Sequence, residues 1–125
     1  MVGRNKDMLN VPKTIFCDID GVLVYHDGSF HPSTTSKMVP IERSILWLRD
    51  WIMKGYTIIL TTGRKESLRE QTVRQLQEAG IAYDQLVMGV GRGVRVLIND
   101  RKPTGQDTAV AFNLTRDEGI TNLEI

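Results

Sequence analysis

The sequence predicts one α/β domain built on a parallel β-sheet with helices on both faces. Apolar runs at 14–17 and 56–60 are continuous rather than alternating, which is typical of strands buried on both faces. Helical patterns separate the apolar runs, so we expect crossover helices between consecutive strands. The chain has 125 residues, enough for one hydrophobic core, and we expect a single domain over 1–125.

The first half of the chain carries signals for two strands joined by a helix. Residues 14–17 read TIFC, a β-branched and aromatic run typical of a strand. Residues 25–40 are rich in Gly, Pro, Ser and Thr and predict a loop. A helix then runs from Pro40 to about residue 54, because apolar residues recur at helical spacing and Gly55 suits its end. This apolar stripe consists of Ile41, Ile45, Leu48 and Ile52.

The second half predicts one more helix and three more strands. The helix spans about Glu66 to Ala79 and ends at Gly80. Its apolar face consists of Leu68, Thr72, Leu76 and Ala79. The strand candidates are the apolar runs at 85–88, 94–98 and 110–114.

Polar side chains follow three of the predicted strands. Asp18 and Asp20 end the first, residues 61–64 (TTGR) follow the second, and Asn99 and Asp100 follow the run at 94–98. In parallel sheets ligands bind at the carboxyl ends of the strands, so we expect these side chains to meet. Two carboxylates about 4 Å apart repel by roughly 4 kcal/mol at an effective dielectric near 20, which a divalent cation would offset. Ligands that are all oxygen atoms suit Mg²⁺.

The stretches IFCDIDGVL, IILTTGR and VLIND resemble motifs I, II and IV of the haloacid dehalogenase (HAD) superfamily. The resemblance runs from about Thr14 to Arg101. It implies a Rossmann-like fold and a Mg²⁺-dependent phosphomonoester phosphatase that acts through an aspartyl phosphate. The acid at Asp20 points to a phosphatase, because dehalogenases of the superfamily lack it.

The resemblance also assigns roles to residues of motifs I and II. Asp18 matches the nucleophile, and Asp20 matches the general acid and base. Thr62 matches the hydroxyl that binds the transferring phosphoryl oxygens, and the backbone amide of Gly63 can assist it. Arg64 either joins this substrate-binding site or pairs with an acid on the neighbouring helix, and the sequence leaves both alternatives open.

The metal ligands implied by the resemblance are Asp18, the backbone carbonyl of Asp20, and motif IV. Here motif IV departs from the usual pattern, because Asn99 stands where an acid is common. Asn99 offers only a neutral oxygen, so Asp100 would supply the anionic contact. We therefore expect weakened binding of Mg²⁺ rather than none.

The lysine of motif III has no counterpart between Met88 and Asp100. Arg92, in a Gly-rich loop, is our candidate to replace it, since arginine can neutralise a phosphate through two hydrogen bonds. Arg95 lies within the predicted strand and is a second candidate, assigned to substrate binding. For both arginines a solvated surface position is the alternative.

Several prominent residues are assigned other roles. Trp47 and Trp51 are expected to pack in a core or an interface, and Cys17 to be a small core residue. His26 and His31 lie in the loop after motif I, where substrate contact is a better expectation than metal ligation.

No segment reaches the roughly 40 residues that a self-standing cap domain needs, so the chain is expected to be capless. Capless relatives act on large substrates, such as proteins or polynucleotide ends, or borrow a lid from a neighbouring subunit. Residues 29–39 and 115–125 are candidates for a lid or an interface, and a homo-oligomer is one expected assembly.

The net charge of +1 lacks the excess of basic residues that is typical of nucleic-acid-binding proteins. We therefore favour a small phosphorylated substrate such as a sugar phosphate. A polynucleotide 3′-phosphatase and a non-catalytic phosphate-binding domain stay open as alternatives. The sequence has no apolar stretch of about 18 residues and no signal-peptide pattern, so we expect no membrane contact and a cytoplasmic location.

Overall fold

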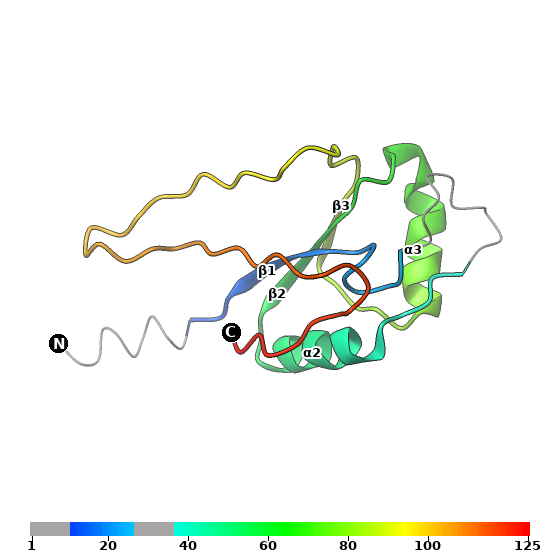
Figure 1. Cartoon of the computed structure of the whole chain (residues 1–125), viewed down its shortest axis with the longest axis horizontal. Coiled ribbons are helices and arrows are strands. Elements are labelled where there is room, and N and C mark those ends of the chain that lie inside the picture. The colour runs from blue at the N-terminus through cyan, green and yellow to red at the C-terminus, as the bar shows by residue number, and fades with distance from the viewer. Residues whose placement is uncertain (1–10, 27–36) are drawn as a thin grey trace.

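The computed structural model describes residues 11–26 and 37–125. They contain a three-stranded parallel sheet with strand order β1–β2–β3 (Figure 1). The strands are β1 (Thr14–Asp18), β2 (Thr57–Thr61) and β3 (Gln85–Val87). The predicted strands at 14–17, 56–60 and 85–88 are therefore present, within a residue or so of the expected bounds, and the α/β fold class is confirmed.

Both predicted helices are also present. They are α2 (Glu42–Met53) and α3 (Arg69–Glu78), and a short 3₁₀ turn, η1 (Glu66–Leu68), precedes α3. In α2 the buried residues are Ser44, Ile45, Leu48 and Trp51, so the stripe differs from the prediction at one position. Ile52 is 37% exposed, and Trp51, seven residues after Ser44, faces the core instead. Trp51 lies in the core and Trp47 is partly buried against it, so the prediction that both tryptophans pack in a core or an interface is confirmed.

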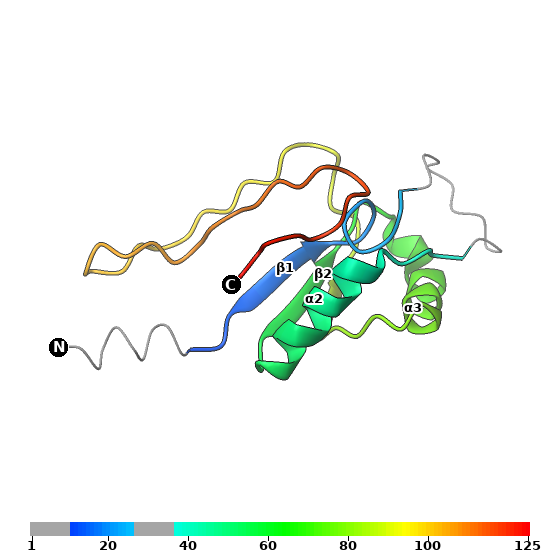
Figure 2. The ribbon, with the colours of Figure 1, turned by 60° about the horizontal axis from the view of Figure 1, so that its bottom comes forward.

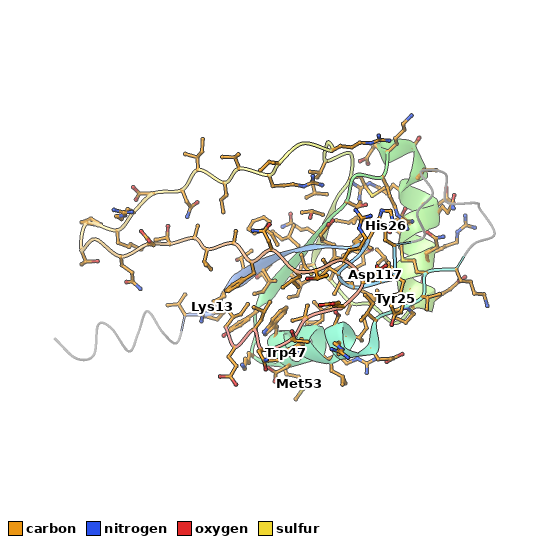
Figure 3. The ribbon with its side chains drawn as sticks, in the orientation of Figure 1. Lys13, Tyr25, His26, Trp47, Met53 and Asp117 are labelled. Carbon is orange, nitrogen blue, oxygen red and sulfur yellow. The ribbon has the colours of Figure 1, made fainter. Side chains whose placement is uncertain are left out.

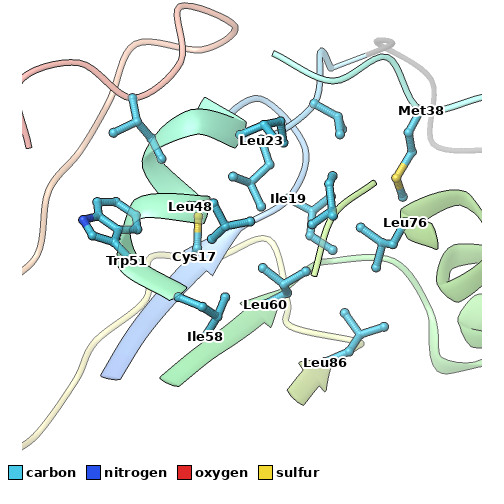
Figure 4. Close-up of a cluster of buried hydrophobic side chains, with 14 of the residues drawn as sticks. Cys17, Ile19, Leu23, Met38, Leu48, Trp51, Ile58, Leu60, Leu76 and Leu86 are labelled. Atoms are coloured by element: carbon cyan, nitrogen blue, oxygen red, sulfur yellow. The ribbon is translucent and has the colours of Figure 1, made fainter. Parts of the chain in front are cut away.

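The hydrophobic core lies between one face of the sheet and the two helices (Figure 4). Its sheet residues are Cys17, Ile58, Leu60 and Leu86, and its helix residues include Leu48, Trp51 and Leu76. Side chains alternate along a strand, so Phe16 points to the opposite face, where it is 61% exposed. Within the described residues, helices therefore cover one face of the sheet and not both as we predicted.

Residues 91–112 form an extended arm that leaves the sheet and returns to it (Figures 1 and 2). The predictions of strands at 94–98 and 110–114 are wrong for this structure, because neither run pairs with a strand of the described residues. Val94 and Ile98 are 92% and 91% exposed. A β-forming sequence becomes a strand only when a neighbour completes its backbone hydrogen bonds, and within 11–26 and 37–125 the one strand paired with β1 is β2.

After the arm, residues 115–125 return to the domain and pack against the loop that follows β1. The backbone N–H of Asp117 donates to the carbonyl of Gly21 at 2.9 Å. The Asp117 carboxylate accepts from the backbone N–H of His26 at 2.7 Å, and the two residues lie side by side in Figure 3. Ile120 is 1% exposed. This segment, which we expected as a lid or interface, is thus part of the domain itself.

A buried serine joins this C-terminal segment to α2. The hydroxyl of Ser44 donates to the carbonyl of Val22 at 2.6 Å and accepts from the backbone N–H of Ile120 at 2.9 Å. Gly119 must be glycine at this junction, because its φ is +81° and a Cβ would lie 2.7 Å from Cγ2 of Ile41. None of the helices in the described ranges is long and apolar enough to cross a membrane.

Replacing Ser44 with alanine tests this junction. The substitution leaves a carbonyl and an N–H unpaired at a fully buried site, so we expect Ser44→Ala to lower the free energy of unfolding by about 1–3 kcal/mol. Urea denaturation measures the change. Leu46→Ala, on the exposed side of α2, is the control and should shift the midpoint much less. Equal stability of Ser44→Ala and the unsubstituted chain would contradict the role of this hydroxyl.

Candidate active site

The pairing of β1 with β2 places motifs I and II side by side. Asp18 lies opposite Thr61, and the N–H of Ile19 extends the ladder by donating to the Thr61 carbonyl at 3.2 Å. Beyond the strand ends, the hydroxyl of Thr62, one residue after β2, donates to Oδ2 of Asp20, two residues after β1, at 3.3 Å. Two of the three predicted polar clusters therefore meet at the carboxyl edge of the sheet.

The carboxylate of Asp18 is the less compensated of the two acids. It is exposed, and its Oδ1 accepts from the N–H of Ile19 at 3.2 Å. Partial desolvation is the largest influence and raises the pKa of Asp18. The charge of Arg95 lowers this pKa, the charge of Asp20 raises it by less, and the Ile19 hydrogen bond and His26 lower it by smaller amounts still. The net pKa is above the usual aspartate value, so a cation or a proton beside Asp18 would be stabilising.

Asp20 is held by an arginine through two hydrogen bonds. Nε of Arg64 donates to Oδ2 of Asp20 at 3.2 Å, and Nη2 donates to Oδ1 at 2.9 Å. The two side chains are only 13% and 28% exposed. The partner of Arg64 is thus the acid of motif I, and its contact on the neighbouring helix is the neutral Gln75, whose Oε1 accepts from Nη1 at 2.7 Å.

The turn of motif II is tightly fixed. The N–H of Arg64 donates to the Thr62 hydroxyl at 3.2 Å, and the carbonyl of Arg64 accepts from Gly89 at 2.7 Å. A Cβ on Gly63 would lie 3.1 Å from the carbonyl oxygen of Val90, so the close approach of this backbone favours glycine. Thr62 itself is fully buried.

Arg95 folds back on its own loop, where Nη1 donates to the carbonyls of Gly91 at 2.7 Å and Gly93 at 2.9 Å. From there its charge lowers the pKa of Asp18. Arg92, which we favoured on sequence grounds, lies exposed in the same loop.

The structure does not bring Asn99 and Asp100 to motif I. Both lie on the arm, where Nδ2 of Asn99 donates to the Thr108 hydroxyl at 2.7 Å and that hydroxyl donates to the Asp100 carbonyl. An ion pair of 2.8 Å between Arg101 and Asp107 joins the same two sides of the arm. Over 11–26 and 37–125, no three His, Cys, Asp or Glu side chains gather as a metal site.

Two residues of the site were missed by the sequence analysis. Gln75 is 6% exposed, and its signal was a polar residue three positions after Thr72, on the side of the helix predicted to be buried. Asp117 left a weaker signal, an Asp shortly before a Gly, and it adopts a positive φ of 66°.

Burial raises the pKa of the Cys17 thiol to about 12, as fits its predicted place in the core. His31 lies outside the described residues.

No protein-family model and no curated protein matches the sequence. Among solved structures, a chain of the Pnkp1/Rnl/Hen1 complex is 32% identical with a TM-score of 0.57, over 68% of this chain and 30% of that one. The chain thus spans about a third of the length of that relative.

A Vibrio cholerae structural-genomics protein has 19% identity and a TM-score of 0.53, covering 67% of this chain and 78% of its own. A D,D-heptose 1.7-bisphosphate phosphatase from B. bronchiseptica, complexed with magnesium and phosphate, has 19% identity and a TM-score of 0.46, over 64% and 51% of the two chains. The geometry of motifs I and II and the parallel α/β fold agree with the resemblance to the haloacid dehalogenase superfamily, and the chain shares its fold with the first two of these solved structures.

Proposed function

We propose that the protein is a phosphomonoester phosphatase that works through a phosphorylated Asp18. The observation that carries this proposal is the pair of acids at the end of β1, which differ in their surroundings. Asp18 has an exposed and under-compensated carboxylate, whereas Asp20 is hydrogen-bonded to Thr62 and Arg64. Two acids in contrasting environments suit one nucleophile and one proton carrier.

In the first step a carboxylate oxygen of Asp18 attacks the phosphorus atom. A bond forms between that oxygen and phosphorus, and the ester P–O bond breaks. The leaving oxygen takes a proton from the carboxylic acid form of Asp20 and departs as an alcohol. In the structure Asp20 accepts from Arg64 and Thr62, so it must turn away from at least one donor to give up a proton.

In the second step water attacks the phosphorus atom of the phosphorylated Asp18. Asp20, now a carboxylate, takes one proton from that water. The bond between phosphorus and Asp18 breaks, inorganic phosphate leaves, and both acids return to their starting forms. The return of Asp20 to Arg64 and Thr62 places it for the next cycle.

Donors at the ends of the strands would bind the phosphoryl oxygens. Thr62 and the N–H of Gly63 lie beside Asp20 at the end of β2. For the missing lysine we propose Arg95, since its charge acts on Asp18, with Arg92 of the same loop as the second candidate. Arg64 is engaged with Asp20, so its contribution to substrate binding would be made through that acid.

We propose Mg²⁺ as the cofactor, where it would neutralise charge between Asp18 and the phosphate. The fit of the described residues is partial, since Asp18 and the carbonyl of Asp20 are in place while Asn99 and Asp100 lie on the arm. The set would be complete if residues 94–98 lay along the free edge of β1, which would carry Asn99 and Asp100 to the end of that strand. The exposed apolar side chains of 94–98 support this placement.

The substrate class has two candidates. The near-neutral charge favours a small phosphorylated metabolite such as a sugar phosphate. The likeness to a chain of an RNA repair complex, at 32% identity, favours a phosphorylated polynucleotide end instead. An exposed Asp18, with no cap domain over it in the described residues, would accept either class. A non-catalytic phosphate-binding role is the alternative that the kinetics below decide.

A screen of phosphate release over sugar phosphates, nucleotides and 3′-phosphorylated oligonucleotides with Mg²⁺ tests the function. We expect turnover by the unsubstituted chain and a loss of at least about a hundredfold in Asp18→Asn, because an amide is a poor nucleophile. Beryllofluoride should bind the unsubstituted chain and not the variant. Turnover of Asp18→Asn within about tenfold of the unsubstituted chain would exclude Asp18 as nucleophile.

The same variant should be more stable than the unsubstituted chain at neutral pH. A carboxyl whose pKa is raised on folding stabilises the fold below its unfolded pKa, near 3.8, and that contribution is lost as the pH rises through the folded value. Asp18→Asn has no such loss. Urea midpoints at pH 7 and pH 3 measure the difference, which should be present at pH 7 and small at pH 3. A less stable variant at pH 7 would contradict the raised pKa.

Titration of Mg²⁺ against turnover tests the metal ligands. Asp100→Asn should raise the Mg²⁺ concentration for half-maximal rate by about tenfold or more, since one unit charge near the cation is worth roughly 1–4 kcal/mol at an effective dielectric of about 20 to 80. Asn99→Asp should lower it. The matched control is Asp107→Asn, an exposed acid of the same arm. If Asp100→Asn behaves like Asp107→Asn, the metal is not held by motif IV.

A further inference from the structure

Helix α3 buries polar side chains against the rest of the domain. Its buried residues are Gln71, Thr72, Gln75 and Leu76, of which only Leu76 belongs to the hydrophobic core cluster. Burying an amide costs free energy unless it is hydrogen-bonded. Gln75, at 6% exposure, therefore needs a structural reason, and its bond to Arg64 supplies one.

The guanidinium of Arg64 is fixed from two sides. Nη1 donates to Gln75 on α3 at 2.7 Å, while Nε and Nη2 donate to Asp20 after β1 at 3.2 Å and 2.9 Å. The group is planar, so a bond at Nη1 sets the direction of the other two donors. Gln75 thereby limits where Arg64 can hold the carboxylate of Asp20.

A neutral acceptor suits this position. A carboxylate at residue 75 would compete with Asp20 for the charge of Arg64, and an apolar side chain would leave an N–H of a largely buried guanidinium unpaired. The glutamine amide bonds the arginine and leaves its charge facing Asp20.

We propose that Gln75 is a positioning residue, which acts through Arg64 to hold the Asp20 carboxylate at the carboxyl end of β1. The proposal rests on the proposed function for the chemistry of Asp20, but the geometric part stands on the contacts alone. Gln75 touches Arg64 rather than the reacting groups, so its loss should lower kcat and leave KM nearly unchanged.

Gln75→Met tests the proposal, because methionine has a similar length and no comparable acceptor. We expect the Arg64 Nε–H signal in a ¹H–¹⁵N spectrum to lose its protection from exchange, and kcat to fall by roughly tenfold to a hundredfold. Gln77→Met, on the exposed side of the same helix, is the matched control and should change neither. Gln75→Glu keeps an acceptor oxygen and should restore the protected Arg64 signal, but its kcat should stay below that of the unsubstituted chain because its carboxylate competes with Asp20 for the charge of Arg64.

The outcomes separate the two proposals. If Gln75→Met keeps both the protected Arg64 signal and kcat, or loses the signal with no change in kcat, the positioning role is overturned. If the unsubstituted chain turns over no phosphomonoester, the proposed function fails, and the Arg64 signal alone decides whether Gln75 holds Arg64. Should Gln75→Met fail to fold, Gln75→Asn, which keeps an amide but shortens its reach, replaces it in both measurements.

Discussion

The in-register pairing of β1 with β2 is the constraint on which the site depends. Five residue pairs, from Thr14 with Thr57 to Asp18 with Thr61, fix the two strand ends at the same level. A slip of one residue would turn Cys17 and Asp18 to the opposite faces and separate Asp20 from Thr62. The contacts of Arg64 with Asp20 exist because the chain after each strand leaves the sheet at this common edge.

The negative charges of Asp18 and Asp20 are stabilised to different extents by the groups around them. Asp20 accepts three hydrogen bonds from Arg64 and Thr62, so its negative charge is largely matched by one fixed positive charge. Burial raises the pKa of Asp18, and the N–H of Ile19 and the charge of Arg95 lower it too little to offset that effect. The protein thus confines its uncompensated charge to the carboxylate that is exposed to an incoming ligand.

The sequence predicted what is decided locally and missed what depends on distant partners. Strands at 14–17 and 56–60 and both helices follow from apolar patterns and glycine positions, and their bounds lie within three residues of the prediction. Residues 94–98 have the same apolar character, but a strand needs a neighbour, and no local pattern specifies one. Asn99 and Asp100 directly follow this run in the chain, so where they lie depends on where the run lies. The contact between Arg64 and Gln75 was not predicted either, because nothing in the sequence indicates which residue a glutamine in a helix will contact.

Because the arm at 91–112 extends away from the sheet, a break of the chain within it would not separate the packed parts of the domain. A protease needs an extended and exposed segment, and these residues offer one about twenty residues long. Beyond the arm, three hydrogen bonds hold the C-terminal residues to the domain. They join the N–H of Asp117 to the Gly21 carbonyl, the N–H of Ile120 to the Ser44 hydroxyl, and the Tyr56 hydroxyl to the Ile125 carbonyl. A chain cut in the arm would therefore remain one folded particle made of two polypeptides, with motifs I and II together on the larger one.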